Sequence, residues 1–182
     1  MEFLHLLNDL KHTPRTGWLY NEIPNPESIS DHMYRMAMLA MIYCPSHLDK
    51  NRAMKVCLCH DVAEALVGDI TPHDPVSPEE KHRRELEAII KMSEMLPEEA
   101  GKEVKECWIE FEEKQTEIAQ FCNQLDKIEM CIQANEYEKK YQKDLSGFFK
   151  SMPKEPLECL KQLCEDVWKE HELNLSNLNQ SK

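Results

Sequence analysis

The hydrophobic residues recur at every third or fourth position along most of the chain, which is the spacing of one face of an α-helix. Between residues 29 and 43, for example, Met33, Met36, Ala37 and Ala40 follow this spacing. Runs of β-branched residues are few, whereas the helix-favouring Leu, Met, Ala, Glu and Lys are frequent. The chain is therefore predicted to be all-α, with six or seven helices. They are expected over residues 3–11, 29–43, 50–67, 77–95, 97–113, 115–142 and 156–172.

Polar and breaking residues mark where these helices start and stop. Asp49 can cap the third helix, and Gly68 stands where a glycine commonly follows a helix end. Ser77 precedes a proline and lies three residues before a glutamate, which together form a strong helix start. The segments 15–28 and 68–76 are rich in proline, so we predict loops there.

The predicted helices are expected to form one domain over residues 1–175, followed by a polar tail over residues 176–182. A chain of 182 residues is long enough to bury one substantial core. No internal repeat or low-complexity linker divides it, and no run approaches the ~20 apolar residues of a membrane span.

Eight cysteines are spread over the chain, mostly within apolar helical patterns. Neither a C-x-x-C metal spacing nor the apolar stretch of a secretory signal accompanies them. We therefore expect reduced thiols that pack as small core residues, in a cytoplasmic protein.

The formal net charge of −12 argues against a partner that is a nucleic acid polymer, because binding its backbone needs a basic surface. A small anionic ligand remains compatible with this charge if a metal or a few basic residues are gathered at one place. Arg15, Arg35 and the cluster 81–84 are the candidates. For the cluster, ion pairs with glutamates one helical turn away are an equal alternative.

Three ionisable residues interrupt an otherwise apolar helical segment, "CLCHDVAEALVGDI". They are His60, Asp61 and Glu64. Burying a charge is costly unless it is paired or coordinates a metal. On a helix, positions three or four apart share a face, so Glu64 is expected to lie beside both of the others.

Two further candidates, His32 and Asp126, lie on other apolar helices. Two imidazoles and two carboxylates form a ligand set that suits Mn, Co, Ni, Fe or Zn better than calcium. Each residue has a simpler interpretation by itself: a hydrogen-bonded core histidine, an ion-paired aspartate or a solvated acidic stripe. Their joint occurrence favours a metal site between helices, because several unpaired buried charges would each cost several kcal/mol.

The spacing of these residues resembles the H…HD…D signature of the HD-domain metal-dependent phosphohydrolases. His60 follows His32 by 28 residues, and Asp126 follows Asp61 by 65. The segments "PRTGW", "PESISDHMYRMA", "HDVAEALVGDI", "EEKHRRE" and "QLDKIEM" resemble the 5′-deoxynucleotidase branch of that family, which includes bacterial YfbR-type enzymes and eukaryotic members. The resemblance runs from about residue 4 to residue 170.

The resemblance implies roles for the metal-site residues. A divalent ion such as manganese or cobalt would be held by His32, His60, Asp61 and Asp126. Glu64 and Asp69 would be catalytic, with Glu64 beside the attacking water as general base or acid. A second ion, such as magnesium, would be shared by Glu64, Asp69 and the Ile70 carbonyl.

It also implies a substrate and the residues that bind it. The reaction would be hydrolysis of deoxyribonucleoside 5′-monophosphates to deoxynucleoside and phosphate, by a homodimer. Arg15 would contact the phosphate, and Trp18 would pack near the sugar and select against a 2′-hydroxyl. The full implied set is Arg15, Trp18, His32, Asp61, Asp69, Ile70, Thr71 and Pro72. The bacterial enzymes have Arg directly before Trp, whereas here two residues intervene.

Two alternatives stay open. One is another HD-type nucleotide phosphohydrolase, either a phosphodiesterase or a pyrophosphohydrolase, although the longer H-x-x-x-H metal helices of phosphodiesterases are absent. The other is a non-catalytic helical scaffold stabilised by a structural metal, although such a site needs no open face. The loop residues His73 and Asp74 could add a ligand, with loop polarity as the simpler explanation.

Overall fold

The computed structural model describes residues 1–180, and its regular secondary structure over that range is helical, with no strand. The prediction of an all-α fold is confirmed. The elements are α1 (Glu2–Leu10), α2 (Thr16–Tyr20), α3 (Ile29–Tyr43), α4 (Lys50–Cys59), α5 (Glu64–Val67), α6 (Pro78–Ser93), α7 (Glu98–Glu113), α8 (Glu117–Tyr141), α9 (Ser146–Phe149), the 3₁₀ turn η1 (Glu158–Leu160) and α10 (Lys161–Gln180).

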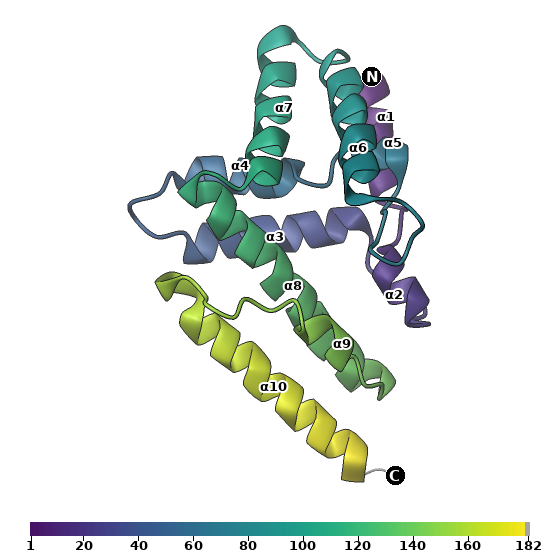
Figure 1. Ribbon diagram of the computed structural model, residues 1–182, viewed down its shortest axis with the longest axis vertical. Helices are drawn as coiled ribbons and strands as arrows, with labels where there is room; N and C mark the ends of the chain where they lie inside the picture. The colour runs from purple at the N-terminus through teal and green to yellow at the C-terminus, as the bar shows by residue number, and fades with distance from the viewer. Residues whose placement is uncertain (181–182) are drawn as a thin grey trace.

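The long helix α8 is the centre of the arrangement, because α3, α4, α7 and α10 all pack against it (Figure 1). α3 and α4 also pack closely on one another, and α10 runs along the far side of α8. At the other end of the molecule α1, α5 and α6 lie together, with α7 beside α6. No helix among residues 1–180 has both the length and the apolar character needed to cross a bilayer.

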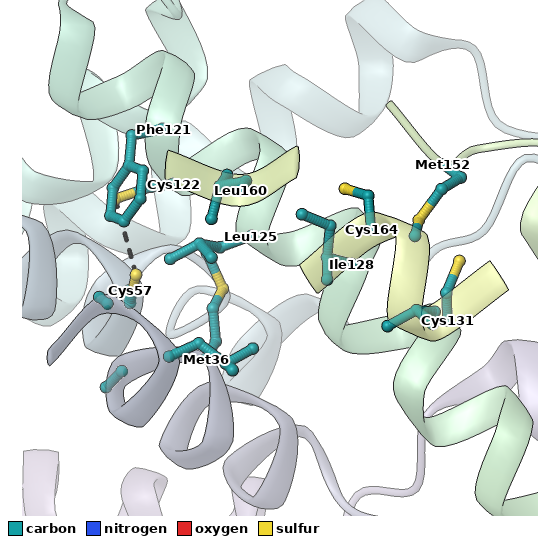
Figure 2. Close-up of a cluster of buried hydrophobic side chains, with 14 of the residues drawn as sticks. Met36, Cys57, Phe121, Cys122, Leu125, Ile128, Cys131, Met152, Leu160 and Cys164 are labelled. Carbon is teal, nitrogen blue, oxygen red and sulfur yellow. Dashed lines mark hydrogen bonds between the residues drawn. The ribbon is translucent and has the colours of Figure 1, made fainter. Parts of the chain in front are cut away.

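Two clusters of buried side chains stabilise this arrangement. The larger one joins α3, α4, α7, α8 and α10, and Figure 2 shows part of it around Met36, Leu125 and Ile128. The smaller one joins α1, α6 and α7 to the start of α3 around Ile29 and Trp108. The cysteines are all free, and most of them are buried within or against the larger cluster, so the prediction that they act as small core residues is confirmed. Burying this apolar surface is the main force that holds the helices together.

The predicted helix starts are present. The Asp49 carboxylate accepts hydrogen bonds from the backbone of Asn51 and Arg52, and the Ser77 hydroxyl accepts one from the backbone N–H of Glu80. Ser28 and Asp31 form a reciprocal capping box at the start of α3. Because α3 carries His32, this cap fixes the first turn of a helix that contributes to the candidate site.

The prediction of one continuous helix over residues 50–67 is wrong. α4 ends at Cys59, and α5 begins at Glu64 after a tight turn. Within that turn, backbone N–H groups bond to the carbonyl three residues back, as from Val62 to Cys59 (3.2 Å). The His60 Nδ1 lies 2.8 Å from the Cys57 carbonyl oxygen, so a side chain occupies an acceptor that a continued α-helix would use.

The C-terminal helix is also longer than predicted. α10 continues to Gln180, because its buried Asn174 donates a hydrogen bond to the Asn135 carbonyl of α8 (3.1 Å) and so extends the contact. Of the predicted tail 176–182, residues 181 and 182 lie outside the described residues, and the boundary at 175 remains a prediction. The short helices α2 and α9 were not predicted, and both line the candidate site.

Candidate metal centre and cleft

Four side-chain atoms from three parts of the sequence converge at one point. The His32 Nε2 atom of α3 lies 3.2 Å from Asp126 Oδ1 of α8 and 3.9 Å from Asp61 Oδ2. The His60 Nε2 atom, from the turn after α4, lies 3.1 Å from Asp61 Oδ2. The structure thus brings together all four ligands proposed from the sequence, and the ligand atoms of His32, His60 and Asp61 lie within 4.8 Å of one another.

The surroundings of the two histidines fit a divalent metal. Both Nε2 atoms are buried, and neither makes a hydrogen bond to any described residue. The other ring nitrogens are engaged, since His32 Nδ1 contacts the Glu129 carboxylate and His60 Nδ1 contacts the Cys57 carbonyl. A metal-binding histidine commonly has this arrangement, in which one ring nitrogen is oriented by a partner and the other faces the ion.

The electrostatics of the cluster also favour a cation. Burial alone would raise the pKa of Asp61, but His60 and Arg15 outweigh it and hold that pKa below its ordinary range. The pKa of Asp126 is held well below its ordinary value by Lys127 and His32, again against burial. Burial and Arg15 lower the pKa of His32, yet Glu129 and Asp126 raise it to about 9. The carboxylates therefore remain ionised and attract positive charge.

Arg15 reaches this cluster despite its unusual spacing from Trp18. Its Nη1 atom donates a hydrogen bond to Asp61 Oδ2 at 2.8 Å. The two intervening residues, Thr16 and Gly17, form the first turn of α2, and Asp69 holds that turn in place. The Thr16 backbone N–H donates to Asp69 Oδ2 (2.6 Å), and the Thr16 hydroxyl donates to the Asp69 carbonyl (2.9 Å).

A cleft of about 530 Å³ opens beside the converging ligands. Its lining includes nine of the residues proposed from the sequence: Arg15, Trp18, Asp61, Glu64, Asp69, Ile70, Thr71, Pro72 and Asp126. His32 and His60 are buried. A nucleotide-sized molecule fits a cleft of this volume, since small-molecule sites span about 300–1,000 Å³.

Glu64 combines burial with an unpaired oxygen. Its side chain lines the cleft although the residue is only 4% exposed, and its Oε2 atom has no hydrogen-bond partner among the described residues. Burial, together with the charges of Asp61 and Asp69, raises the pKa of Glu64 well above its ordinary value. A carboxyl group in this environment can hold a proton and release it, which is the property required of a general acid.

Trp18 is a wall of the cleft rather than an exposed loop residue, since only 1% of it is exposed. Its ring packs on Phe148 of α9, with centroids 4.2 Å apart, and makes a T-shaped contact with Tyr137 of α8. Its Nε1 atom donates a hydrogen bond to Glu27 Oε1 at 2.9 Å. Contacts from α8, from α9 and from the segment between α2 and α3 therefore hold the indole ring.

Comparison with known proteins identifies the family. Residues 7–172 match the HD domain family. The chain belongs to the HD domain family. It is 50% identical over 138 residues to the 5′-deoxynucleotidase HDDC2 of Bos taurus, covering 76% of this chain and 67% of that protein. It is 48% identical over 152 residues to the 5′-deoxynucleotidase hdd1 of Schizosaccharomyces pombe, covering 80% and 77%.

Solved structures share the fold of this chain. A conserved hypothetical protein from Pyrococcus furiosus superimposes with a TM-score of 0.75 at 30% identity, over 92% of this chain and 98% of that one. A protein described as a predicted metal-dependent phosphohydrolase, from Magnetospirillum magnetotacticum, has a TM-score of 0.73 at 22% identity and supports the fold alone. The HD domain resemblance stated from the sequence is confirmed.

The surroundings of the candidate metal centre and the cleft include residues that the sequence did not reveal. Glu129, buried behind the proposed ligand His32, could have been found because it lies one helical turn from Asp126 in "QLDKIEM". The cleft is lined as well by Lys127 and by Phe148 and Lys150 in and just after α9. The sequence of α9 has no periodic hydrophobic pattern, so the contribution of this helix to the cleft wall could not be predicted.

Other polar residues considered in the sequence have partners in the structure. Arg35 lies behind His32, where its Nε atom donates to Glu129 Oε1 at 2.7 Å. Arg83 and Arg84 pair with glutamates of their own helix, as the alternative interpretation of the basic cluster predicted. Lys81 also pairs with Glu85 of that helix, and it lines the cleft as well. Asp74 accepts hydrogen bonds from the backbone and hydroxyl of Thr71, so its role is to shape the loop.

Proposed function

We propose that this HD domain protein is a metal-dependent 5′-deoxynucleotidase, which hydrolyses deoxyribonucleoside 5′-monophosphates to deoxynucleoside and phosphate. The observation that carries the proposal is the convergence of two histidines and two aspartates beside a cleft that also contains Arg15. Relatives that are 48–50% identical are 5′-deoxynucleotidases, which supports the same substrate class.

The proposed reaction assigns a separate task to each group. A divalent ion held by His32, His60, Asp61 and Asp126 would supply Lewis acidity toward the phosphoryl group and lower the pKa of water. Arg15, anchored beside this point, neutralises charge on the phosphate oxygens as the bond to phosphorus breaks. Glu64 holds a proton at its carboxyl group and delivers it to the departing 5′-oxygen, or accepts one from the attacking water.

The sugar and the phosphate are proposed to lie along the loops that line the cleft. Trp18 packs against the deoxyribose and leaves no space for a 2′-hydroxyl. Asp69, Ile70, Thr71 and Pro72 form the opposite loop, and Asp69 also holds the α2 turn that carries Arg15 and Trp18. The contact between this loop and α2 would hold the two sides of the cleft in place around the substrate before bond cleavage.

We propose magnesium as a second ion, held by Glu64, Asp69 and the Ile70 carbonyl. This ion would compete with the Lys81 ammonium for the Ile70 carbonyl. The Lys81 ammonium donates a hydrogen bond to the Ile70 carbonyl at 3.0 Å and lies 3.4 Å from Glu85. Entry of a second ion would require Lys81 to move away. Substitution of Lys81 by methionine should therefore increase magnesium binding if this second site forms.

Three further properties belong to the same proposal. The first ion is proposed to be manganese or cobalt, because the site offers two nitrogen and two oxygen ligands. The protein is proposed to be a cytoplasmic homodimer, and the eight free thiols suit a reducing compartment. Metal analysis of the purified protein and light scattering in solution test the metal and the oligomeric state.

The decisive experiment measures phosphate release from dAMP and dTMP by protein that has been stripped of metal and then reloaded. We expect metal-dependent hydrolysis that is lost in His60→Ala and in Asp61→Ala, with Arg83→Ala as a matched surface control. Activity that persists in the folded, metal-free variants would contradict the proposal. Faster turnover of cyclic or pyrophosphorylated nucleotides would favour another HD-type phosphohydrolase. Unfolding on chelation, with no turnover of any substrate, would favour a metal-stabilised scaffold.

A further inference from the structure

Glu27 is a nearly buried carboxylate that has no role in the function proposed above. It lies in the segment between α2 and α3, and its side chain is 8% exposed. The segment is itself well anchored, since the Glu27 backbone N–H donates to the Tyr137 hydroxyl at 2.7 Å. Burial of a carboxylate at a fixed place is costly, so the contacts that it makes identify what it does.

Its contacts on one side are to the α2 segment that carries the proposed substrate residues. The Glu27 carbonyl accepts a hydrogen bond from the Arg15 backbone N–H at 3.1 Å. The Glu27 Oε1 atom accepts one from Trp18 Nε1 at 2.9 Å. One residue thus contacts both the proposed phosphate-binding residue and the proposed sugar-selecting residue.

Its contacts on the other side lead to the metal centre. The Glu27 Oε2 atom lies 3.9 Å from Arg35 Nη2, and Arg35 Nε donates to Glu129 Oε1 at 2.7 Å. The other oxygen of Glu129 contacts the ligand His32. Polar contacts therefore run without interruption from the indole of Trp18 to a metal ligand.

The hydrogen bond to Glu27 is the directional contact of the buried Trp18 indole. Phe148 and Tyr137 pack on the ring with interplanar angles of 32° and 83°, and hydrophobic packing of this kind is non-directional. Within residues 1–180, Glu27 is the partner found for the indole N–H. A directional bond of this kind sets where the ring edge lies in the cleft.

We propose that Glu27 is a positioning residue, which orients the Trp18 indole and thereby sets the discrimination between deoxyribose and ribose. The inference rests on the proposed function, because it concerns how the same cleft selects its substrate. Loss of the acceptor would let the ring rotate and admit a 2′-hydroxyl, whereas the metal ligands and Arg15 would still engage the phosphate.

The test is a double-mutant cycle on the metal-loaded protein, with the ratio of kcat/KM for dAMP over AMP as the readout. We expect Glu27→Leu to lower this ratio up to about tenfold, the effect of losing one buried hydrogen bond. Glu27→Gln should keep most of the ratio, because its amide oxygen can still accept from the indole. In the Trp18→Phe background, which lacks the indole N–H, Glu27→Leu should change the ratio no further.

Glu136→Leu is the matched control, since Glu136 is a second carboxylate partner of Arg35, at 2.9 Å, on the exposed side. It should leave the ratio unchanged. A spectroscopic readout is independent of turnover: the Trp18 indole ¹H–¹⁵N resonance, assigned by its loss in Trp18→Phe, should move upfield in Glu27→Leu and stay in place in Glu136→Leu.

If folded Glu27→Leu keeps the wild-type ratio of kcat/KM for dAMP over AMP, the inference is overturned. Equal hydrolysis of dAMP and AMP by the wild-type protein would overturn it as well. If the wild-type protein releases phosphate from neither nucleotide, the proposed function fails, and the indole resonance still decides whether Glu27 orients Trp18. If Glu27→Leu does not fold, rapid solvent exchange of the wild-type Trp18 indole proton would overturn the inference, and slow exchange would support it.

Discussion

Replacing Glu129 with glutamine should weaken metal binding without rearranging the fold. Glu129 is fully buried on α8, where one carboxylate oxygen contacts His32 Nδ1 and the other accepts a hydrogen bond from Arg35 at 2.7 Å. Glutamine has nearly the same shape, so the substitution removes the negative charge while the side chain still fills its space. The change therefore tests the carboxylate and not the packing.

The size of the effect follows from these two contacts. A carboxylate behind a metal-binding histidine makes the ring a more basic ligand, and removal of such a partner typically costs ~10–100-fold in metal affinity. That range corresponds to about 1.4–2.8 kcal/mol of binding free energy. The single amide oxygen of glutamine can accept from only one of Arg35 and His32, and the lost hydrogen bond to a charged group contributes about 1.5–3 kcal/mol to stability. We expect weaker metal binding together with a lower unfolding free energy.

Titration of the metal-free protein with manganese in a calorimeter measures the metal affinity, and urea denaturation measures the unfolding free energy. Glu136→Gln is the control, because it removes an exposed charge from the same arginine without contacting His32. An unchanged dissociation constant in folded Glu129→Gln would refute the inference that Glu129 tunes the metal ligand.

Three further predictions concern the loop, the buried charge on α6 and the core. Asp69→Ala should raise KM for dAMP about tenfold, because Thr16 loses the acceptor that holds its backbone N–H at 2.6 Å. Burial and the nearby Glu112 raise the pKa of Glu85 to about 7, so the folded protein binds this proton more tightly than the unfolded chain. The wild-type protein should therefore lose stability as pH rises from about 4.5 through 7, and Glu85→Gln should gain about 1–2 kcal/mol over it at pH 8 and nothing at pH 4, measured by urea denaturation. Leu125→Ala, in the buried face of α8, should cost about 2–5 kcal/mol of unfolding free energy.

Each of these has a discriminating control. Asp69→Asn keeps an oxygen that can accept from Thr16, so it should restore KM; a kcat that stays low in both variants would instead indicate a direct role of the Asp69 charge. Equal pH profiles for Glu85→Gln and the wild-type protein would contradict the buried-charge argument. Leu173→Ala removes an exposed leucine and should change stability by less than about 0.5 kcal/mol; a similar loss in both leucine variants would contradict the core assignment.

The proposed metal ligands were predictable because each lies within a strongly apolar helical pattern, where a charge stands out. Their joint occurrence and the resemblance to the HD-domain signature linked His32, the His60–Asp61 pair and Asp126, and the structure places their side-chain atoms together. The helix starts at Asp49 and Ser77 were predictable for a related reason, since capping depends on neighbouring residues only.

The features that sequence reasoning missed depend on contacts between distant residues. Trp18 is buried because Phe148, far along the chain, packs on its ring. The basic cluster 81–84 was a candidate as a whole, but the sequence did not show which member reaches the cleft. Lys81 does so because the loop that ends at Ser77 brings it beside the Ile70 carbonyl, which no helical period reveals. Glu27 lies in a segment with no regular pattern, and its importance follows only from where its two oxygens lie.

The turn between α4 and α5 follows directly on the proposed ligand pair. Neighbouring side chains on a helix point about 100° apart. The His60 backbone is still helical, with φ −61° and ψ −38°, and the His60 Nε2 and Asp61 Oδ2 atoms lie only 3.1 Å apart. The Cys57 carbonyl, which contacts His60 Nδ1, helps to orient this ring toward Asp61. A design that transfers this pair to another scaffold should therefore include the turn and the contact between His60 Nδ1 and the Cys57 carbonyl, and not only the His-Asp dipeptide.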